Sequence, residues 1–205
     1  MLPLRHWFDF LFPPRTDETA VLDVSIDAFL ARMIPRLTPV TRPGTVVLLP
    51  FHDVSVRSAI HEAKYHGNTL AFALLAAALA EYLYDNDEGF RKPIIIPLPL
   101  GKKRRAERGF NQIEDVIQRA VNDLDIAIDT TLLERTRETV SQVSLPRHKR
   151  EENMRGAFKT TRPADPSRAY IVIDDVITTG ATLQAAIDAL QEAGAAHIIP
   201  LALAH

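Results

Sequence analysis

Residues 171–183 read IVIDDVITTGATL, and this stretch decides the fold. It opens with β-branched apolar residues, as a buried strand does, and these end at the adjacent acids Asp174 and Asp175. Two threonines, a glycine and the start of a helical apolar pattern follow directly. This order predicts a strand, a tight turn and a helix, with both acids at the carboxyl end of the strand.

The flanking sequence extends this unit into an α/β fold. A strand at 169–175, a helix at 181–193 and a strand at 197–203 follow in order, which predicts a parallel sheet with helices on its faces. The same patterns predict strands at 45–50, 93–99, 130–136 and 157–161, and helices at 54–66, 69–84 and 110–124. Residues 1–43 are set apart by six prolines, so we expect an N-terminal appendage at 1–43 and one main domain at 44–205.

Composition excludes several classes of protein. The chain has 24 Lys+Arg against 26 Asp+Glu, so no general nucleic-acid-binding coat is indicated. It has no cysteine, which rules out disulfides and thiolate metal sites and is compatible with a reducing cytoplasm.

The sequence predicts neither a membrane span nor a signal peptide. The apolar run at 70–80 is shorter than the about 20 residues that span a bilayer. The segment 1–12 contains Arg5, His6 and Asp9, which is unlike a signal peptide. We expect a cytoplasmic protein without membrane insertion.

The turn after the acids has the chemistry of an anion site. Ligands of open α/β sheets bind at the carboxyl ends of strands, and the first amides of a helix favour phosphate. Helix capping alone needs one polar residue rather than two acids and three threonines. A P-loop needs a lysine directly after the glycine, where Ala181 stands. A receiver-type acid pair on Mg²⁺ does not need the threonines.

A sugar phosphate uses both parts of the stretch. The turn would hold the phosphate, and Asp174 and Asp175 would accept hydrogen bonds from the ribose hydroxyls. The residues predicted to bind the phosphate are Thr178, Thr179, Gly180, Ala181 and Thr182.

The stretch IVIDDVITTGAT closely resembles the 5-phosphoribosyl-1-pyrophosphate (PRPP) motif of type I phosphoribosyltransferases. The resemblance implies a Rossmann-like parallel sheet and a ligand that is PRPP or another phosphorylated ribose. It also implies glycosyltransferase chemistry, with Asp174 and Asp175 at the reaction centre and Mg²⁺ brought in with PRPP.

A second group of residues is strongly basic. Residues 97–112 read PLPLGKKRRAERGFNQ and follow a predicted strand, so we expect a basic loop at the same edge of the sheet. Its cations are Lys102, Lys103, Arg104, Arg105 and Arg108. A solvated charged loop, a nuclear-localisation patch and a nucleic-acid contact are alternatives. The position favours contact with a ligand, where cations would stabilise departing pyrophosphate.

Several shorter motifs are similar to one branch of that superfamily, the competence protein F (ComF) family, which includes GntX-type proteins. They are PLPL, RGFNQ (108–112), KYHGN (64–68), the Thr-x-x-Gln at 139–142 and RHKREENMRGAF (147–158). The residues that this resemblance adds at the ligand edge are Lys64, Asn111, Gln112, Gln142 and Arg150.

The chain departs from that branch at its N-terminus, where relatives have two Cys-x-x-Cys zinc pairs. Thr16 and Thr19 stand at the first pair, and Ser25 and Ala28 match the second. Hydroxyls do not replace thiolates at a structural zinc, so we expect no zinc. We expect this segment to be held by packing of Leu11, Phe12, Val21, Val24 and Phe29.

The motif HEAKYH (61–66) is not expected to bind metal, because its histidines are five residues apart rather than four and should not share a helical face.

Two functions stay open at this point. One is Mg²⁺-dependent phosphoribosyl transfer to an acceptor that the sequence does not identify, with residues 139–146 as a lid. The other is a competence or DNA-processing accessory that binds single-stranded DNA, with PRPP as a regulatory or relic ligand. The sequence does not define the oligomeric state.

Overall fold

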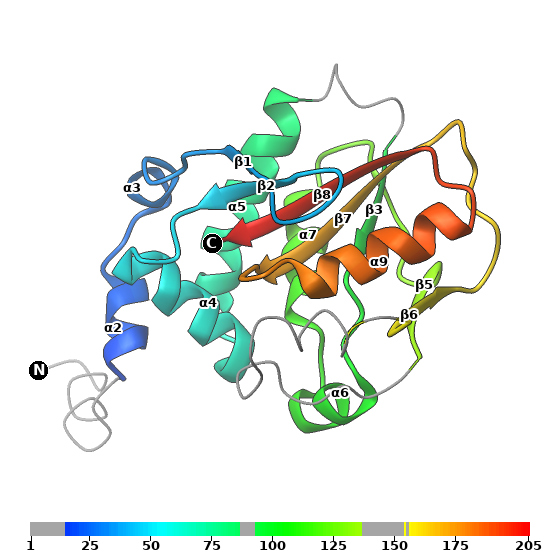
Figure 1. The fold of residues 1–205 in the computed structure, drawn as a ribbon. Helices are drawn as coiled ribbons and strands as arrows, with labels where there is room; N and C mark the ends of the chain where they lie inside the picture. Colours follow the sequence, from blue (N-terminus) through cyan, green and yellow to red (C-terminus); the bar gives the residue numbers. More distant parts are fainter. Residues whose placement is uncertain (1–14, 87–92, 137–153, 155) are drawn as a thin grey trace, which may run out of the picture.

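The computed structural model describes residues 15–86, 93–136, 154 and 156–205 (Figure 1). Its centre is a six-stranded sheet with the order β1-β2-β8-β7-β3-β4. The strands are β1 (Arg36–Thr38), β2 (Thr45–Leu49), β3 (Ile94–Pro97), β4 (Ala127–Ile128), β7 (Ala169–Val176) and β8 (His197–Ala204). All neighbours are parallel except β1 and β2, which are antiparallel. The predicted parallel α/β fold is confirmed.

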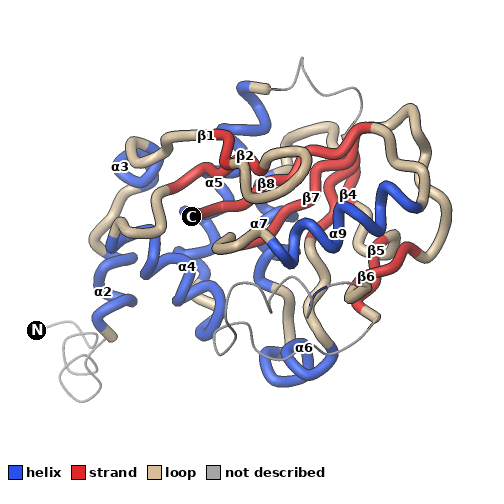
Figure 2. Tube along the Cα trace, viewed as in Figure 1, coloured by secondary structure: helices blue, strands red, loops and turns tan. Residues whose placement is uncertain are grey.

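The helices of the described residues surround this sheet (Figure 2). They are α2 (Thr16–Leu22), α3 (Ile26–Leu30), α4 (Val54–His66), α5 (Thr69–Asp85), α6 (Lys102–Arg108), α7 (Gln112–Ala120) and α9 (Ala181–Glu192). A separate antiparallel pair is formed by β5 (Leu133–Arg135) and β6 (Phe158–Thr160). None of the helices described is long and apolar enough to cross a membrane.

The two faces of the sheet are covered by different helices. Along β7, the side chains of Ile171 and Ile173 pack with α4, α5 and α7 in one core. Those of Tyr170 and Val172 pack with α9 in a second core on the other face. This alternation is the period of two that a strand imposes, and burial on both faces explains why the strand is apolar throughout. Figure 1 shows α9 crossing in front of the sheet.

The N-terminal helices attach to α4 and α5 through apolar packing. Val21 and Phe29 are fully buried, and Val24 packs against the same core, as expected. Leu11 and Phe12 lie outside the described residues.

An ionic clamp, which the sequence did not predict, joins α2 to α4. Arg15 donates through Nε and Nη2 to the buried Glu62 carboxylate at 3.1 and 2.8 Å. Asp17 accepts from Ser58 Oγ at 2.8 Å and pairs with His61. Burial opposes ionisation of Glu62, but the Arg15 and Asn68 hydrogen bonds outweigh it and lower the Glu62 pKa.

Candidate functional site

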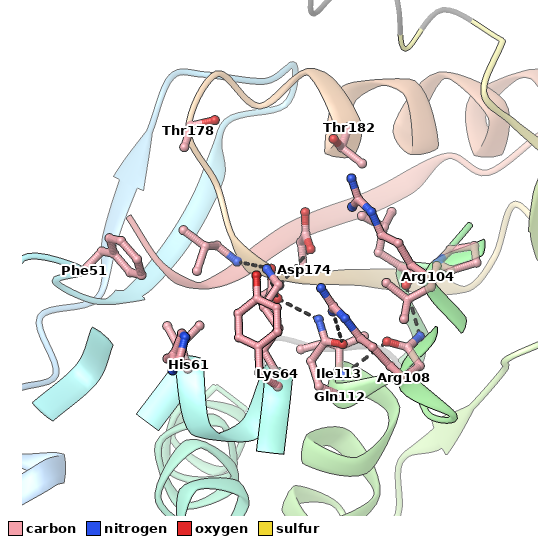
Figure 3. Close-up of a pocket in the computed structure, with 18 of the residues that line it drawn as sticks. Phe51, His61, Lys64, Arg104, Arg108, Gln112, Ile113, Asp174, Thr178 and Thr182 are labelled. Carbon is pink, nitrogen blue, oxygen red and sulfur yellow. Dashed lines mark hydrogen bonds and ion pairs between the residues drawn. The ribbon is translucent and has the colours of Figure 1, made fainter. Parts of the chain in front are cut away.

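A cavity of about 650 Å³ lies at the carboxyl ends of β3 and β7. Its walls come from α4 on one side, α6 and the start of α7 on another, and the β7–α9 turn (Figure 3). This is the edge where open α/β sheets bind ligands. The sequence-predicted residues that line it are Lys64, Arg104, Arg108, Asn111, Gln112, Asp174, Asp175, Thr178 and Thr182.

Asp175, a buried residue that lines the cavity, is held by three donors. Its Oδ2 pairs with Lys64 Nζ at 3.0 Å and accepts from Gln112 Nε2 at 2.7 Å, while its Oδ1 accepts from the Val176 amide at 2.7 Å. The residue is only 7% exposed. Burial opposes its ionisation, but the nearby Lys64 charge and these hydrogen bonds outweigh burial and lower the pKa of Asp175. Asp175 is therefore an ionised carboxylate with a fixed orientation.

Asp174 has a different environment. It is partly exposed and lines the cavity, and its Oδ1 accepts the Asp175 amide at 2.8 Å. Burial and the negative charge of Asp175 raise the pKa of Asp174 to about 7. The two adjacent acids thus differ: one is a fixed anion, and the other titrates near neutral pH and faces the space that a ligand would occupy.

The two short motifs from distant parts of the chain meet at Asp175. Lys64 belongs to KYHGN, and Gln112 belongs to RGFNQ. Gln112 Oε1 also accepts from Arg108 Nη1 at 3.0 Å, so the basic helix α6 is linked through Gln112 to the acid pair. Both motifs therefore orient the carboxylate of Asp175.

The β7–α9 turn, where the sequence predicts phosphate binding, lies at the edge of the cavity. Gly180 is the N-cap of α9 with φ 75° and provides no side-chain cap, while the Ala181 amide donates to Thr179 Oγ1 at 3.5 Å. The side chains of Thr178 and Thr182 line the cavity, whereas Thr179, Gly180 and Ala181 do not. The helix dipole adds a positive end here.

The expected basic loop is a helix, α6, and this corrects the prediction. Gly101 and Gly109 bound it, and its charged residues gave no apolar period from which a helix could be recognised. Helical spacing directs only Arg104 and Arg108 into the cavity, because they are four residues apart. Lys102, Lys103 and Arg105 are exposed and do not line it.

Other predicted residues fall into three groups. Asn111 lines the cavity but is 2% exposed, donates to the Leu98 carbonyl and accepts from the Ile113 amide, so it positions the start of α7. Gln142 and Arg150 lie outside the described residues. The premise that His61 and His66 do not share a helical face was wrong, because their ring centroids are 5.6 Å apart. The expectation that this motif binds no metal stays a prediction.

Sequence reasoning missed several residues that line the cavity. They are Phe51, Arg57, His61, Tyr65 and Arg135. Tyr65 lies in KYHGN and His61 in HEAKYH, but neither motif predicted that these side chains line the cavity. The five residues come from the end of β2, from α4 and from β5, and they meet only in the folded protein.

The parallel sheet flanked by helices defines a Rossmann-like α/β protein with a phosphoribosyltransferase-like fold. DNA utilization protein YhgH of Shigella flexneri is 33% identical over 142 residues, which are 68% of this chain and 62% of that protein. Competence protein F of Haemophilus influenzae is 34% identical over 106 residues, 51% of this chain and 46% of that protein. Competence protein ComFC of Streptococcus pneumoniae is 31% identical over 145 residues, 70% and 60% of the two chains.

The chain belongs to the ComF family. It spans about three fifths of the length of relatives such as YhgH and ComFC. No model of a protein family matches it.

Proposed function

We propose that this protein binds PRPP, or another phosphorylated ribose, as part of DNA uptake or utilisation. The observation that supports the proposal most strongly is the placement of the α9 N-terminus, a titratable carboxylate and the two cavity-facing arginines of α6 around one cavity. A sugar phosphate needs all three: donors for its phosphate, acceptors for its hydroxyls and cations for a second anionic group. The names of the relatives supply the biological context.

The reaction that suits these groups is phosphoribosyl transfer. In it, the turn at 178–182 would hold the 5′-phosphate, and Asp174 would accept hydrogen bonds from the ribose. Arg104 and Arg108 would stabilise departing pyrophosphate by their charge. Asp175 would act by fixing its neighbour, since both of its oxygens accept hydrogen bonds within the protein.

The residues present also fit a magnesium ion carried by PRPP. Mg²⁺ prefers oxygen ligands and binds through one or two carboxylates together with substrate phosphates. Asp174 is the carboxylate of the cavity that could contribute, because Asp175 is engaged by Lys64 and Gln112. The ion would neutralise charge on the pyrophosphate.

The test is ligand-induced thermal stabilisation. PRPP with Mg²⁺ at 100 times its Kd should stabilise the native protein by about 2.7 kcal/mol, visible as a rise of several degrees in Tm. Asp174→Asn/Asp175→Asn should abolish this rise. Asp123→Asn/Asp125→Asn is the matched control, since both residues are exposed acids outside the cavity, and it should retain the rise. An equal rise in all three proteins would refute the proposed site.

Single-stranded DNA is a second candidate ligand, favoured by the exposed cations of α6 that face away from the cavity, Lys102 and Arg105 among them. Such cations would contact a phosphate backbone without using the sugar-phosphate site. In that case Lys102→Ala/Arg105→Ala would weaken binding of an oligonucleotide and reduce its salt dependence, while the PRPP-induced rise in Tm would stay intact.

A further inference from the structure

The last turn of α4 lies between the N-terminal helix α2 and the cavity. Glu62 is fully buried on the side that faces α2, where its carboxylate accepts the two hydrogen bonds from Arg15. Lys64 lines the cavity and pairs with Asp175 at 3.0 Å (Figure 3). Side chains two residues apart on a helix differ in direction by about 200°, so a single turn of α4 makes both contacts. Figure 1 shows α2 beside α4.

Glu62 also fixes the junction that follows Lys64. Its backbone carbonyl accepts from the Gly67 amide and, at 3.3 Å, from the Asn68 amide, where α4 ends. Its Oε2 accepts from Asn68 Nδ2 at 3.2 Å, and Asn68 is the N-cap of α5. Residues 63–67 are therefore held between Glu62 and the start of α5. A change in the orientation of the Glu62 side chain would move this segment, which contains Lys64.

Arg15 keeps the buried Glu62 carboxylate ionised and oriented. Burial opposes the charge, but the hydrogen bonds from Arg15 and Asn68 outweigh burial and hold the pKa of Glu62 below its ordinary value. His66 is another basic group beside it, but its Nε2 is 3.8 Å from Glu62 Oε1 and it is a cation only when protonated. Without Arg15, the buried carboxylate would lose its permanent counter-charge and would turn toward water or take up a proton.

We propose that Arg15 is a positioning residue for the cavity, acting through Glu62 and the last turn of α4. It fixes Lys64 in contact with Asp175, whose neighbour Asp174 faces the space of the ligand. Arg15 itself does not line the cavity. This inference rests on the proposed function for its effect on a ligand, whereas the placement of Lys64 can be measured without one.

The first measurement uses the ligand-free full chain. NMR of the aspartate carboxylates would follow the titration of Asp174. Burial and the charge of Asp175 raise the pKa of Asp174, and the charge of Lys64 opposes them. Arg15→Met should displace Lys64 and so raise the pKa of Asp174 above its wild-type value. If Arg15 supported the fold alone, this titration would not change.

The second measurement is calorimetry with PRPP and Mg²⁺. We expect Arg15→Met to raise the Kd about 10-fold, the lower end of the effect that orienting groups behind the ligands have at metal sites. Arg15→Lys keeps a cation beside Glu62 but replaces the two-bond fork by a single ammonium, so both measurements should give an intermediate result. Arg15→Lys is also the test variant if Arg15→Met does not fold.

Ser58→Ala is the matched control. Ser58 Oγ donates to Asp17 at 2.8 Å, so this substitution also removes a contact between α2 and α4, but it leaves Arg15 and Glu62 in place. Ser58 is buried and does not line the cavity. The control should keep the wild-type titration of Asp174 and the wild-type Kd.

The two measurements separate this inference from the proposed function. Where the wild type binds PRPP, the inference is wrong if Arg15→Met titrates and binds like Ser58→Ala. It is also wrong if only one of the two measurements changes, because the effect would then not pass through Lys64 to the ligand. If no protein binds PRPP, the wild type included, the proposed function is wrong, and the titration of Asp174 alone decides whether Arg15 positions Lys64.

Discussion

Gly180→Ala is expected to lower the free energy of unfolding by about 2–5 kcal/mol and to abolish stabilisation by PRPP. A β-carbon at this position would meet the Val40 carbonyl oxygen at 2.5 Å and Thr41 Cγ2 at 3.0 Å. Overpacking of this kind costs roughly 1–3 kcal/mol, and the positive φ of 75° adds about 1–2 kcal/mol for any residue with a side chain. Urea unfolding at pH 7 would measure the loss.

Gly109→Ala is the matched control for that measurement. Gly109 also has a positive φ, 79°, but a β-carbon there would meet nothing within 4 Å. The control should therefore lose only the roughly 1–2 kcal/mol of the backbone conformation. The difference between the two variants isolates the contact of the turn with residues 40 and 41. Equal losses would mean that this contact does not constrain the turn.

The effect of Gly180→Ala is expected to be large because the loop between β1 and β2 packs against the β7–α9 turn. Residues 40–42 run against its outer side, where the Arg42 amide donates to Gln184 Oε1 at 2.7 Å. Gln184 lies in the first turn of α9, so the loop between β1 and β2 is tied to the same helix end that is proposed to hold phosphate. A rigid turn lowers the cost of ordering the site when a ligand binds.

The sequence predicted those elements whose ends and periodicity are encoded locally. The helix at 54–66 was predicted with the bounds that α4 has, because Asp53 caps its first amides and Gly67 ends it in the left-handed conformation. Strand β7 and helix α9 followed from apolar spacing in the same way. By contrast, α6 has no buried residue, and a helix of charged residues gives no apolar period.

In the site, too, the residues of one continuous motif could be predicted, whereas contacts between distant segments could not. Asp174, Asp175 and the threonines form one continuous motif and could be located from the sequence. Lys64 and Gln112 were expected at the ligand edge from the family resemblance, but their contacts with Asp175 could not be predicted, since they reach it from α4 and α7. Tyr65 belongs to the motif KYHGN, but its place in the cavity was missed, because its contact with Arg108 forms only when α4 and α6 pack together.

Asp174→Asn is expected to make the ligand-free protein more stable at pH 8 than the wild type. The pKa of Asp174 is raised to about 7 by burial and by Asp175, so between about pH 4 and pH 7 the native state binds more protons than the unfolded chain. Wild-type stability therefore falls as the pH rises through this window. Asparagine does not titrate, so the free energy of unfolding of the variant should exceed that of the wild type by roughly 1–3 kcal/mol at pH 8. This is less than the whole pKa shift would give, because Asp174 is partly open to solvent and its titration is coupled to that of Asp175.

Urea unfolding at pH 4.5, 6 and 8 would test this expectation, with Asp123→Asn as the control at an exposed position. The gain from Asp174→Asn should grow with pH, whereas the control should follow the wild type. Parallel curves for all proteins would show that Asp174 titrates as an ordinary surface acid. Suppose that the stability gained from Asp174→Asn grows with pH and that PRPP no longer stabilises this variant. The wild-type carboxylate then destabilises the protein at the position where the proposed ribose needs an acceptor. Such a conflict between stability and function is expected at a binding site.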